Sequence, residues 1–192
     1  MSFGRIRFTT RLDHAGLRSL YADREPFHWL DAGVTVTAFA NDEGPHWHYV
    51  ALGAREALGQ ELSFRLATGS VDEAAPRWPV ELLRRLAHHA VGCTHPIGDG
   101  WYVCFEEPLD PDGSLRCVAL VPDPQLDGAM LAVGLHEAEL SLMSEDGYGR
   151  FLGALRERDP LLVTHPERDP LVLELVDAGV RDQAFGPKLV IR

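Results

Sequence analysis

The chain has 192 residues, of which 29 are acidic, 18 are basic and 45% are hydrophobic. This length is typical of one domain with a core of its own. The net charge of −11 and the single lysine, Lys188, argue against nucleic-acid binding and against binding to an anionic membrane, since both need clustered Lys and Arg. No run approaches about 18 apolar residues, and the charged start does not fit a signal peptide. We therefore expect a cytoplasmic protein.

The three cysteines, Cys93, Cys104 and Cys117, are odd in number and lie 11 and 13 positions apart. These separations fit neither a disulfide framework nor a C-x-x-C metal site. The surrounding runs are apolar, so the sequence predicts buried free thiols.

The excess negative charge is concentrated in one stretch. Between positions 98 and 147, eleven acidic residues and one basic residue, Arg116, give a net charge of −10. The acids alternate with apolar runs, which indicates a folded segment with an acidic outer surface. This surface is interpreted either as an aid to solubility or as a docking face for a basic partner.

The first third of the chain predicts a short helix and a hairpin. Asp13 can cap a helix that ends before Pro26. Strands at 34–40 and 46–52 flank a turn-rich connector. In the second strand, the side chains of Trp47, Tyr49 and Ala51 point to one face, and those of His46, His48, Val50 and Leu52 to the other.

The middle of the chain predicts a strand and a helix. Residues 61–66 alternate between apolar and polar, which is typical of a half-buried antiparallel strand. Pro79 then stands where a helix tolerates it, in the first turn. An apolar stripe follows, formed by Leu82, Leu83, Leu86 and Ala90.

The remaining elements are strands with two helical segments. Runs at 101–105 and 115–121 predict a hairpin, with the second strand in a central position. A buried strand is expected at 130–135, a helical turn at 136–140 and a helix at 148–158. Short apolar runs at 161–164 and 171–176 and a pairing segment at 189–191 complete the list. The predicted fold is α+β, a single domain over 1–192 with one mixed β-sheet flanked by helices.

His46 and His48 could belong to a metal site. Side chains two positions apart on a strand project from the same face, about 7 Å apart, and could supply two ligands to zinc or iron. No third ligand stands at a recognisable spacing. A metal-dependent enzyme or sensor built on this pair remains an alternative function.

Other catalytic patterns are missing from the sequence. Gly-x-Ser-x-Gly and Ser-x-x-Lys do not occur. Glu106 and Glu107 are adjacent and would point to opposite faces of a strand, which is poor geometry for acid–base cooperation. His89 ends the predicted helix, where a cap is the simplest role. We expect no enzymatic activity, cofactor or metal.

Three motifs in order suggest a family. They are His46-Trp-His-Tyr-Val-Ala-Leu-Gly53, Glu61-Leu-Ser-Phe-Arg-Leu66 and Ala75-Pro-Arg-Trp-Pro-Val-Glu-Leu-Leu83. Shorter matches are Pro108-Leu109-Asp110, Pro122-Asp-Pro-Gln125 and Leu162-Val-Thr164. This order resembles the Suppressor of Fused domain family, with its H-W-H-Y, E-L-T-F-R-L and W-P-x-E-L patterns. The resemblance runs over residues 12–165.

The resemblance implies a domain that binds a protein or peptide partner. In eukaryotic relatives such a domain holds a transcription factor, and many bacterial relatives resemble immunity proteins that neutralise toxins. By position, His89 stands where the family has a Tyr and Asp99 matches an Asp, both on the peptide-binding side. The expected partner-binding residues are His46, Trp47, His48, Tyr49, His89, Asp99, Glu106, Glu107 and Asp110.

The leading hypothesis is a non-catalytic immunity protein whose partner is a basic toxin domain. A regulator that binds an endogenous peptide is a further alternative, because it would need the same kind of surface but no neighbouring toxin.

Overall fold

The computed structural model describes residues 17, 21, 24–31, 33–42, 44–91, 97–111, 113, 115–140, 148–171 and 188–191. Within these ranges the strands are β1 (Phe27–Asp31), β2 (Val34–Asn41), β3 (His46–Leu52), β4 (Glu61–Ala67), β5 (Tyr102–Phe105), β6 (Leu115–Pro122), β7 (Ala129–His136) and β8 (Lys188–Ile191). The helical elements are α2 (Arg55–Leu58), α3 (Trp78–Val91), the 3₁₀ turn η1 (Glu137–Glu139) and α5 (Tyr148–Arg158).

The described strands form one mixed sheet in the order β1-β2-β3-β4-β7-β6-β5-β8. Neighbours are antiparallel except for the pairs β4–β7 and β5–β8, which are parallel. The predicted β2–β3 and β5–β6 hairpins and the central place of β6 are confirmed. The edge strand β1 is not anticipated by the sequence analysis. Most of the predicted helix after Asp13, Cys93 and most of the 171–176 run lie outside the described residues.

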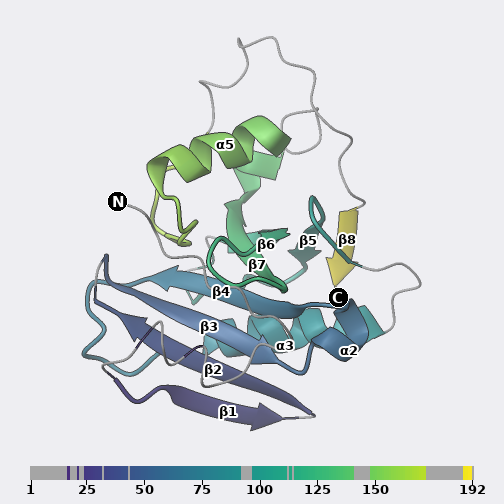
Figure 1. The fold of residues 1–192 in the computed structure, drawn as a ribbon. Helices are drawn as coiled ribbons and strands as arrows, with labels where there is room; N and C mark the ends of the chain where they lie inside the picture. Colours follow the sequence, from purple (N-terminus) through teal and green to yellow (C-terminus); the bar gives the residue numbers. More distant parts are fainter. Residues whose placement is uncertain are drawn as a thin grey trace.

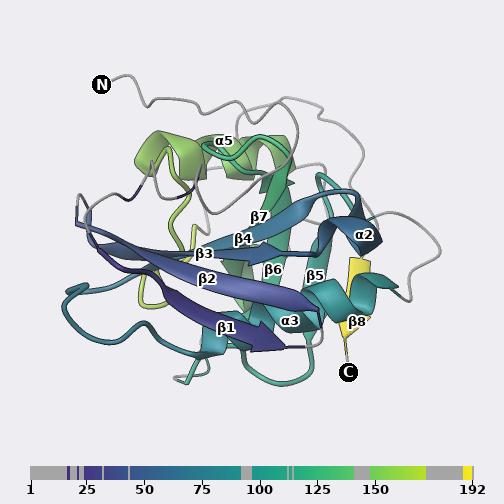
Figure 2. The same ribbon diagram turned by 60° about the horizontal axis from the view of Figure 1, so that its bottom comes forward.

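Helices cover both faces of the sheet, as Figures 1 and 2 show, with α5 above it and α3 below it. The apolar stripe of α3 packs against alternate residues of β3 and β4, including Tyr49 and Phe64. On the opposite face, Phe151 and Leu155 of α5 pack on β6 and β7. The α+β fold with a mixed sheet flanked by helices is therefore confirmed.

The prediction of a half-buried β4 is wrong. Glu61, Ser63 and Arg65, the polar half of its alternation, are 4%, 0% and 0% exposed. The reason is that β4 lies in the middle of the sheet, paired with β3 and β7, and both of its faces are covered. The polar residues are therefore internal and need internal partners.

Asp123 is the main partner of this buried polar face. Arg65 Nη2 donates to Asp123 Oδ1 at 2.9 Å, and Ser63 Oγ donates to Asp123 Oδ2 at 2.5 Å. The backbone amides of Gln125 and Leu126 donate to Oδ1 as well, at 2.8 and 3.0 Å. Burial raises the pKa of Asp123, but the charges and hydrogen bonds of Arg65 and His48 together outweigh this effect and hold that pKa well below its usual range. The pair is therefore an ion pair.

The acidic stretch is only partly an outer surface. Asp110, Asp123 and Glu139 are buried. Glu139 forms an ion pair with Arg168, whose Nη2 donates to Oε2 at 2.7 Å. Two of these three carboxylates thus neutralise arginines from outside the stretch. The prediction that the acids form an outer surface needs correction at these positions.

The prediction of free thiols is wrong for two cysteines. Cys104 and Cys117 are direct partners in the β5–β6 register, with a Cα–Cα distance of 4.1 Å, and they form a disulfide. Their separation of 13 positions places them opposite each other on the two strands of the β5–β6 hairpin. Disulfides persist in oxidising compartments, so this bond does not favour the predicted cytoplasmic location.

Removing the charge of Asp123 should destabilise the fold. In Asp123→Asn, Arg65 becomes an unpaired buried cation, and we expect the free energy of unfolding to fall by about 3 kcal/mol. Denaturant unfolding would measure this change. Glu157→Gln, at an exposed position of α5, is the control and should stay within about 0.5 kcal/mol of the parent. A loss below about 1 kcal/mol for Asp123→Asn would contradict the structural role of the pair.

Reduction of the disulfide should also destabilise the protein. A sequence separation of 13 positions between the two cysteines corresponds to about 3 kcal/mol in the chain-entropy treatment of cross-links. Unfolding curves with and without reductant measure the difference, with Cys104→Ser/Cys117→Ser as the reductant-insensitive control. Peptide mapping under non-reducing conditions should find Cys104 linked to Cys117. Recovery of both as free thiols from air-oxidised protein would contradict the bond.

Candidate functional site

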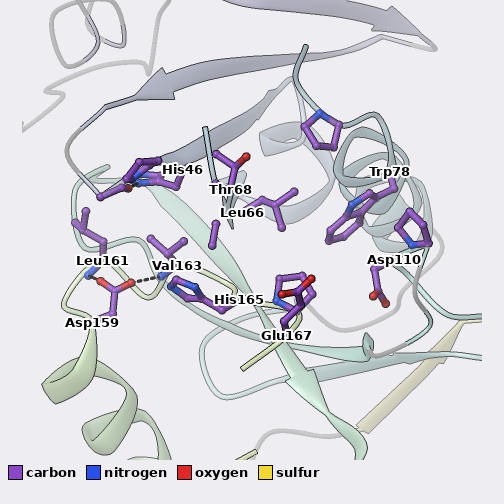
Figure 3. A pocket seen from close by; sticks show the side chains of 17 residues that line it. His46, Leu66, Thr68, Trp78, Asp110, Asp159, Leu161, Val163, His165 and Glu167 are labelled. Atoms are coloured by element: carbon purple, nitrogen blue, oxygen red, sulfur yellow. Dashed lines mark hydrogen bonds between the residues drawn. The ribbon is translucent and has the colours of Figure 1, made fainter. Parts of the chain in front are cut away.

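The candidate site is a pocket of about 860 Å³ at the end of the sheet where β3 begins and β4 ends. Figure 3 shows the side chains that line it. Five chain segments contribute: residues 44–46, 66–69, 76 and 78, 110–111, and the 159–167 segment after α5. Its volume lies in the usual range for ligand-binding pockets.

Turns at the strand ends place the first two walls. Gly44 has a φ of +68°, a conformation that glycine tolerates best, and it reverses the chain into β3. The amide of Thr68 donates to the carbonyl of Pro45 at 3.0 Å, which ties the segment after β4 to the β2–β3 turn. The third wall is formed by Trp78 at the start of α3, whose ring meets Phe64 edge-on at a centroid distance of 5.3 Å.

The 159–167 segment is held by backbone pairing and by Asp159. The amides of Leu161 and Val163 donate to the Asp159 carboxylate at 2.9 and 3.0 Å. The Thr164 amide donates to the Arg65 carbonyl at 2.8 Å, so the segment runs beside β4. Gly134 permits this approach, because a Cβ there would lie 2.5 Å from Thr164 Cγ2. The pocket walls are therefore fixed by hydrogen bonds.

His46 supplies a buried hydrogen-bond acceptor to the pocket wall. Its side chain is almost fully buried, and its Nδ1 lies 2.8 Å from the carbonyl oxygen of Gly44. A carbonyl only accepts, so Nδ1 carries the proton and Nε2 carries a lone pair. Among the described residues Nε2 has no hydrogen-bond partner. Burial is the main cause that lowers the pKa of His46, which keeps the ring neutral near pH 7.

The charge of the pocket lining is negative. The carboxylates of Asp110, Asp159 and Glu167 line it, and no Lys or Arg is among the described lining residues. Asp110 is 6% exposed and accepts the Leu115 amide at 2.8 Å. The rest of the wall is largely apolar: Leu66, Trp78, Leu161, Val163 and four prolines, Pro45, Pro76, Pro111 and Pro166.

Most of the His-Trp-His-Tyr motif is internal. Trp47 and Tyr49 lie in the core between the sheet and α3, and the Tyr49 hydroxyl donates to the Pro76 carbonyl at 2.7 Å. His48 is 0% exposed and lies on the opposite face, where it is hydrogen-bonded to the Tyr21 hydroxyl. Its Nε2 is 3.5 Å from Asp123 Oδ2. Of the four residues only His46 lines the pocket.

The other predicted partner-binding residues are spread over the molecule. Asp99 is exposed before β5 and accepts a hydrogen bond of 2.9 Å from Tyr148. Glu106 and Glu107 are exposed at the other end of β5. His89 is half-buried near the end of α3. The structure thus brings only His46 and Asp110 to one pocket, although Glu106 and Glu107 belong to the hairpin that carries Asp110. A direct role of any of the nine in partner binding stays a prediction.

The His46–His48 pair has no third ligand in the described part of the chain. His48 Nδ1 is occupied by Tyr21, and His46 Nδ1 by Gly44. Among the described residues no group of three or more His, Cys, Asp or Glu side chains is placed to hold a metal ion. These contacts give both rings a hydrogen-bonding role.

Several lining residues are not recognisable as site residues from the sequence, among them Leu66, Trp78, Asp159, His165 and Glu167. Leu66 and Trp78 stand inside the family motifs, but those motifs do not show which side chains face a cavity. Asp159 and Glu167 flank the short apolar run at 161–164. Nothing in their local pattern marks them, because the pocket forms only when five segments meet.

Comparison with known proteins gives the family. The sequence pattern described as Suppressor of fused protein (SUFU) matches residues 31–169. The chain belongs to this family. The suppressor of fused homologs of Homo sapiens and Mus musculus are each 28% identical over 174 residues, covering 70% of this chain and 36% of theirs. The chain therefore spans about a third of the length of these relatives.

A crystal structure described as a SUFU homolog from Neisseria gonorrhoeae FA 1090 has the same fold. Its TM-score is 0.64 at 15% identity, over 82% of this chain and 93% of that one. The family match includes every residue that lines the pocket. No helix in the described part of the chain is long and apolar enough to span a membrane.

Acid should destabilise the protein through His48. Burial and the charge of Arg65 lower its pKa from 6.5 to about 3 in the folded state. Between these values the unfolded chain binds a proton that the folded chain does not, so stability is lost as pH falls below about 6.5. We expect His48 to account for about 2 kcal/mol of the stability lost between about pH 7.5 and 5.

Denaturant unfolding at several pH values measures this effect. In His48→Gln the free energy of unfolding should fall less steeply with decreasing pH below about 6.5, by a slope equivalent to about one proton. This difference in slope does not depend on how stable the variant is at neutral pH. Between about pH 7.5 and 8.5 the curves of variant and parent should run parallel. If the free energy of unfolding of variant and parent changed with the same slope below about pH 6.5, His48 would not be the group responsible.

Proposed function

We propose that this chain is a non-catalytic protein-binding domain whose pocket holds part of a polypeptide partner. The observation that carries the proposal is the pocket itself, which lies within the region that matches the SUFU family. The names of the curated relatives describe suppression and not a reaction. The chain spans 36% of the length of these relatives, and we propose that it shares their non-catalytic role.

The chemistry of the lining supports binding over catalysis. His46 uses Nδ1 to hold the β2–β3 turn, and Asp159 uses both carboxylate oxygens to hold its own loop. The Thr68 hydroxyl donates to the Ser70 carbonyl at 2.8 Å. A nucleophile, a base and a group that orients the base must be hydrogen-bonded to one another in acyl-transfer sites. These side chains are instead bonded to backbone groups, which favours a rigid recognition surface.

The charge near the pocket favours a basic partner. Glu106 and Glu107 are exposed on the β5–β6 hairpin, and the same hairpin brings Asp110 into the pocket. Arg116, which donates to the Glu106 backbone carbonyl at 3.1 Å, adds one positive charge to this hairpin. A mainly acidic field raises the rate of encounter with a positively charged protein. We propose a basic toxin domain as the partner, which would make the chain an immunity protein.

Co-expression with the product of the neighbouring reading frame tests this proposal. The two proteins should co-purify, and the chain should relieve growth inhibition by that product. Absence of both effects would contradict the immunity role. Relief of toxicity without a complex would contradict protein binding as its mechanism.

Charge reversal on the hairpin should slow association. For Glu106→Lys/Glu107→Lys we expect an association rate at least about tenfold lower at low salt, with a smaller change in dissociation. The effect should shrink as salt rises from about 50 to about 200 mM. Glu56→Lys/Glu137→Lys, which changes two exposed acids elsewhere, is the matched control in surface plasmon resonance. Equal rates for both double variants would contradict the docking face.

A further inference from the structure

We propose that the pocket binds an arginine side chain presented by the partner polypeptide. The inference rests on the proposed function, since it names what the partner inserts. It is carried by three features of the lining: an unpaired buried acceptor, an excess of carboxylates and long apolar walls.

The buried acceptor is His46 Nε2. The side chain is 1% exposed, and Nε2 has no partner among the described residues. A buried polar atom without a hydrogen bond is costly, and such atoms are rare in folded proteins. Because the Nδ1 proton is donated to Gly44, Nε2 can only accept. A ligand group that bonds Nε2 would therefore have to bring an N–H or O–H donor to this end of the pocket.

The carboxylates indicate that the donor is cationic. Asp110, Asp159 and Glu167 line the same pocket as His46, and no Lys or Arg is among the described lining residues. Each Asp159 oxygen accepts one amide and keeps a second lone pair free for another donor. The buried cation that influences His46, Arg65, is already paired with Asp123. A positively charged ligand would thus meet three carboxylates and no Lys or Arg among the described lining residues.

The walls favour arginine over a small cation. Leu66, Trp78 and Val163 provide an apolar passage for an aliphatic stem, which arginine buries while its charged head reaches polar groups. Its guanidinium has five N–H donors in a plane, which suits several separate acceptors and stacking on an aromatic ring. Lysine carries a more strongly hydrated charge with three donors. At about 860 Å³ the pocket also has room for residues flanking the arginine.

The depth of the lining residues gives the ligand a direction. His46 is almost fully buried, whereas His165 and Glu167 are exposed. Figure 3 shows His46 beside Leu161 and Asp159, with Glu167 and Asp110 farther along the cavity. A side chain entering past Glu167 would place its head toward His46 and Asp159. The partner backbone would then remain near the surface.

Peptide probes test the proposal directly. Three capped pentapeptides of the form Gly-Leu-Xaa-Leu-Gly, with Xaa as arginine, lysine or citrulline, would be titrated into the full chain. Calorimetry and the ¹⁵N shift of the histidine rings would follow binding. We expect saturable binding of the arginine peptide, with a shift at His46 Nε2, and at least tenfold weaker binding of the uncharged citrulline peptide. Equal affinity of the arginine and citrulline peptides would overturn the proposal.

Two variants and one control place the interaction in the pocket. Glu167→Gln, at the exposed rim, and His46→Gln should each weaken the arginine peptide by about fivefold or more. Glu137→Gln, an exposed acid outside the pocket, should leave binding unchanged. Circular dichroism would verify that each variant is folded. Should His46→Gln fail to fold, Glu167→Gln and the ring shift of the parent decide the outcome. No effect of Glu167→Gln together with an unperturbed His46 ring would overturn the proposal.

The outcome separates this inference from the proposed function. If a protein partner co-purifies but the arginine peptide does not bind, the inference fails and the binding function stands. If agmatine, a free alkylguanidinium, binds as tightly as the peptide, the assignment to a polypeptide side chain is overturned. Specific peptide binding with loss of the natural partner in Glu167→Gln supports both.

Discussion

The buried ion pair between Arg65 and Asp123 is the constraint around which this fold is arranged. It joins the central strand β4 to the turn between β6 and β7, and both side chains are 0% exposed. A charge inside a protein must be paired and hydrogen-bonded, because its desolvation costs several kcal/mol. The pair meets this requirement with Ser63, Gln125 and two backbone amides. Each of these partners is thereby fixed relative to β4.

The Arg65 region also shapes the pocket. Arg65 bonds the Leu161 carbonyl through Nη1 at 3.4 Å, and its own carbonyl accepts the Thr164 amide. The chain after α5 is therefore aligned along β4, where it forms one wall of the pocket opposite Trp78. His46 stands next to Ala67 in the β3–β4 register, at the end of the same strand. A structural ion pair thus positions groups that can meet a ligand.

The acidic residues of the chain divide into two classes with different physical roles. Asp123 and Glu139 are internal counter-ions, and their charges are cancelled by arginines from other parts of the sequence. Glu106 and Glu107 remain in solvent, where a charge acts over about a Debye length and is weakened by salt. Net charge over a stretch of sequence cannot distinguish the two classes. Only the second contributes to an electrostatic field that a partner can meet at a distance.

The local elements of the fold could be predicted from the sequence. Helix α3 and helix α5 follow from apolar residues at helical spacing, and the β2–β3 and β5–β6 hairpins follow from strand patterns joined by turn residues. These signals depend on neighbours within a few positions. The edge strand β1 escaped the sequence analysis because its five residues show no clear alternation, with Leu30 78% exposed.

Long-range features were decided by the tertiary structure. Alternation in β4 predicted one solvent-exposed face, but segments distant in sequence cover that face, since Ser63 and Arg65 are bonded to Asp123 and Arg65 also to the Leu161 carbonyl. The disulfide could be recognised only from the register of the β5–β6 hairpin. The Arg65–Asp123 ion pair could be recognised only from the central position of β4. The sequence by itself determined the family motifs and the periodic elements, since both are local patterns. Only the tertiary structure decided the pocket, the neutral state of His46 and the division of the acidic residues into buried and exposed. The reason is that burial and proximity depend on segments that meet only in three dimensions.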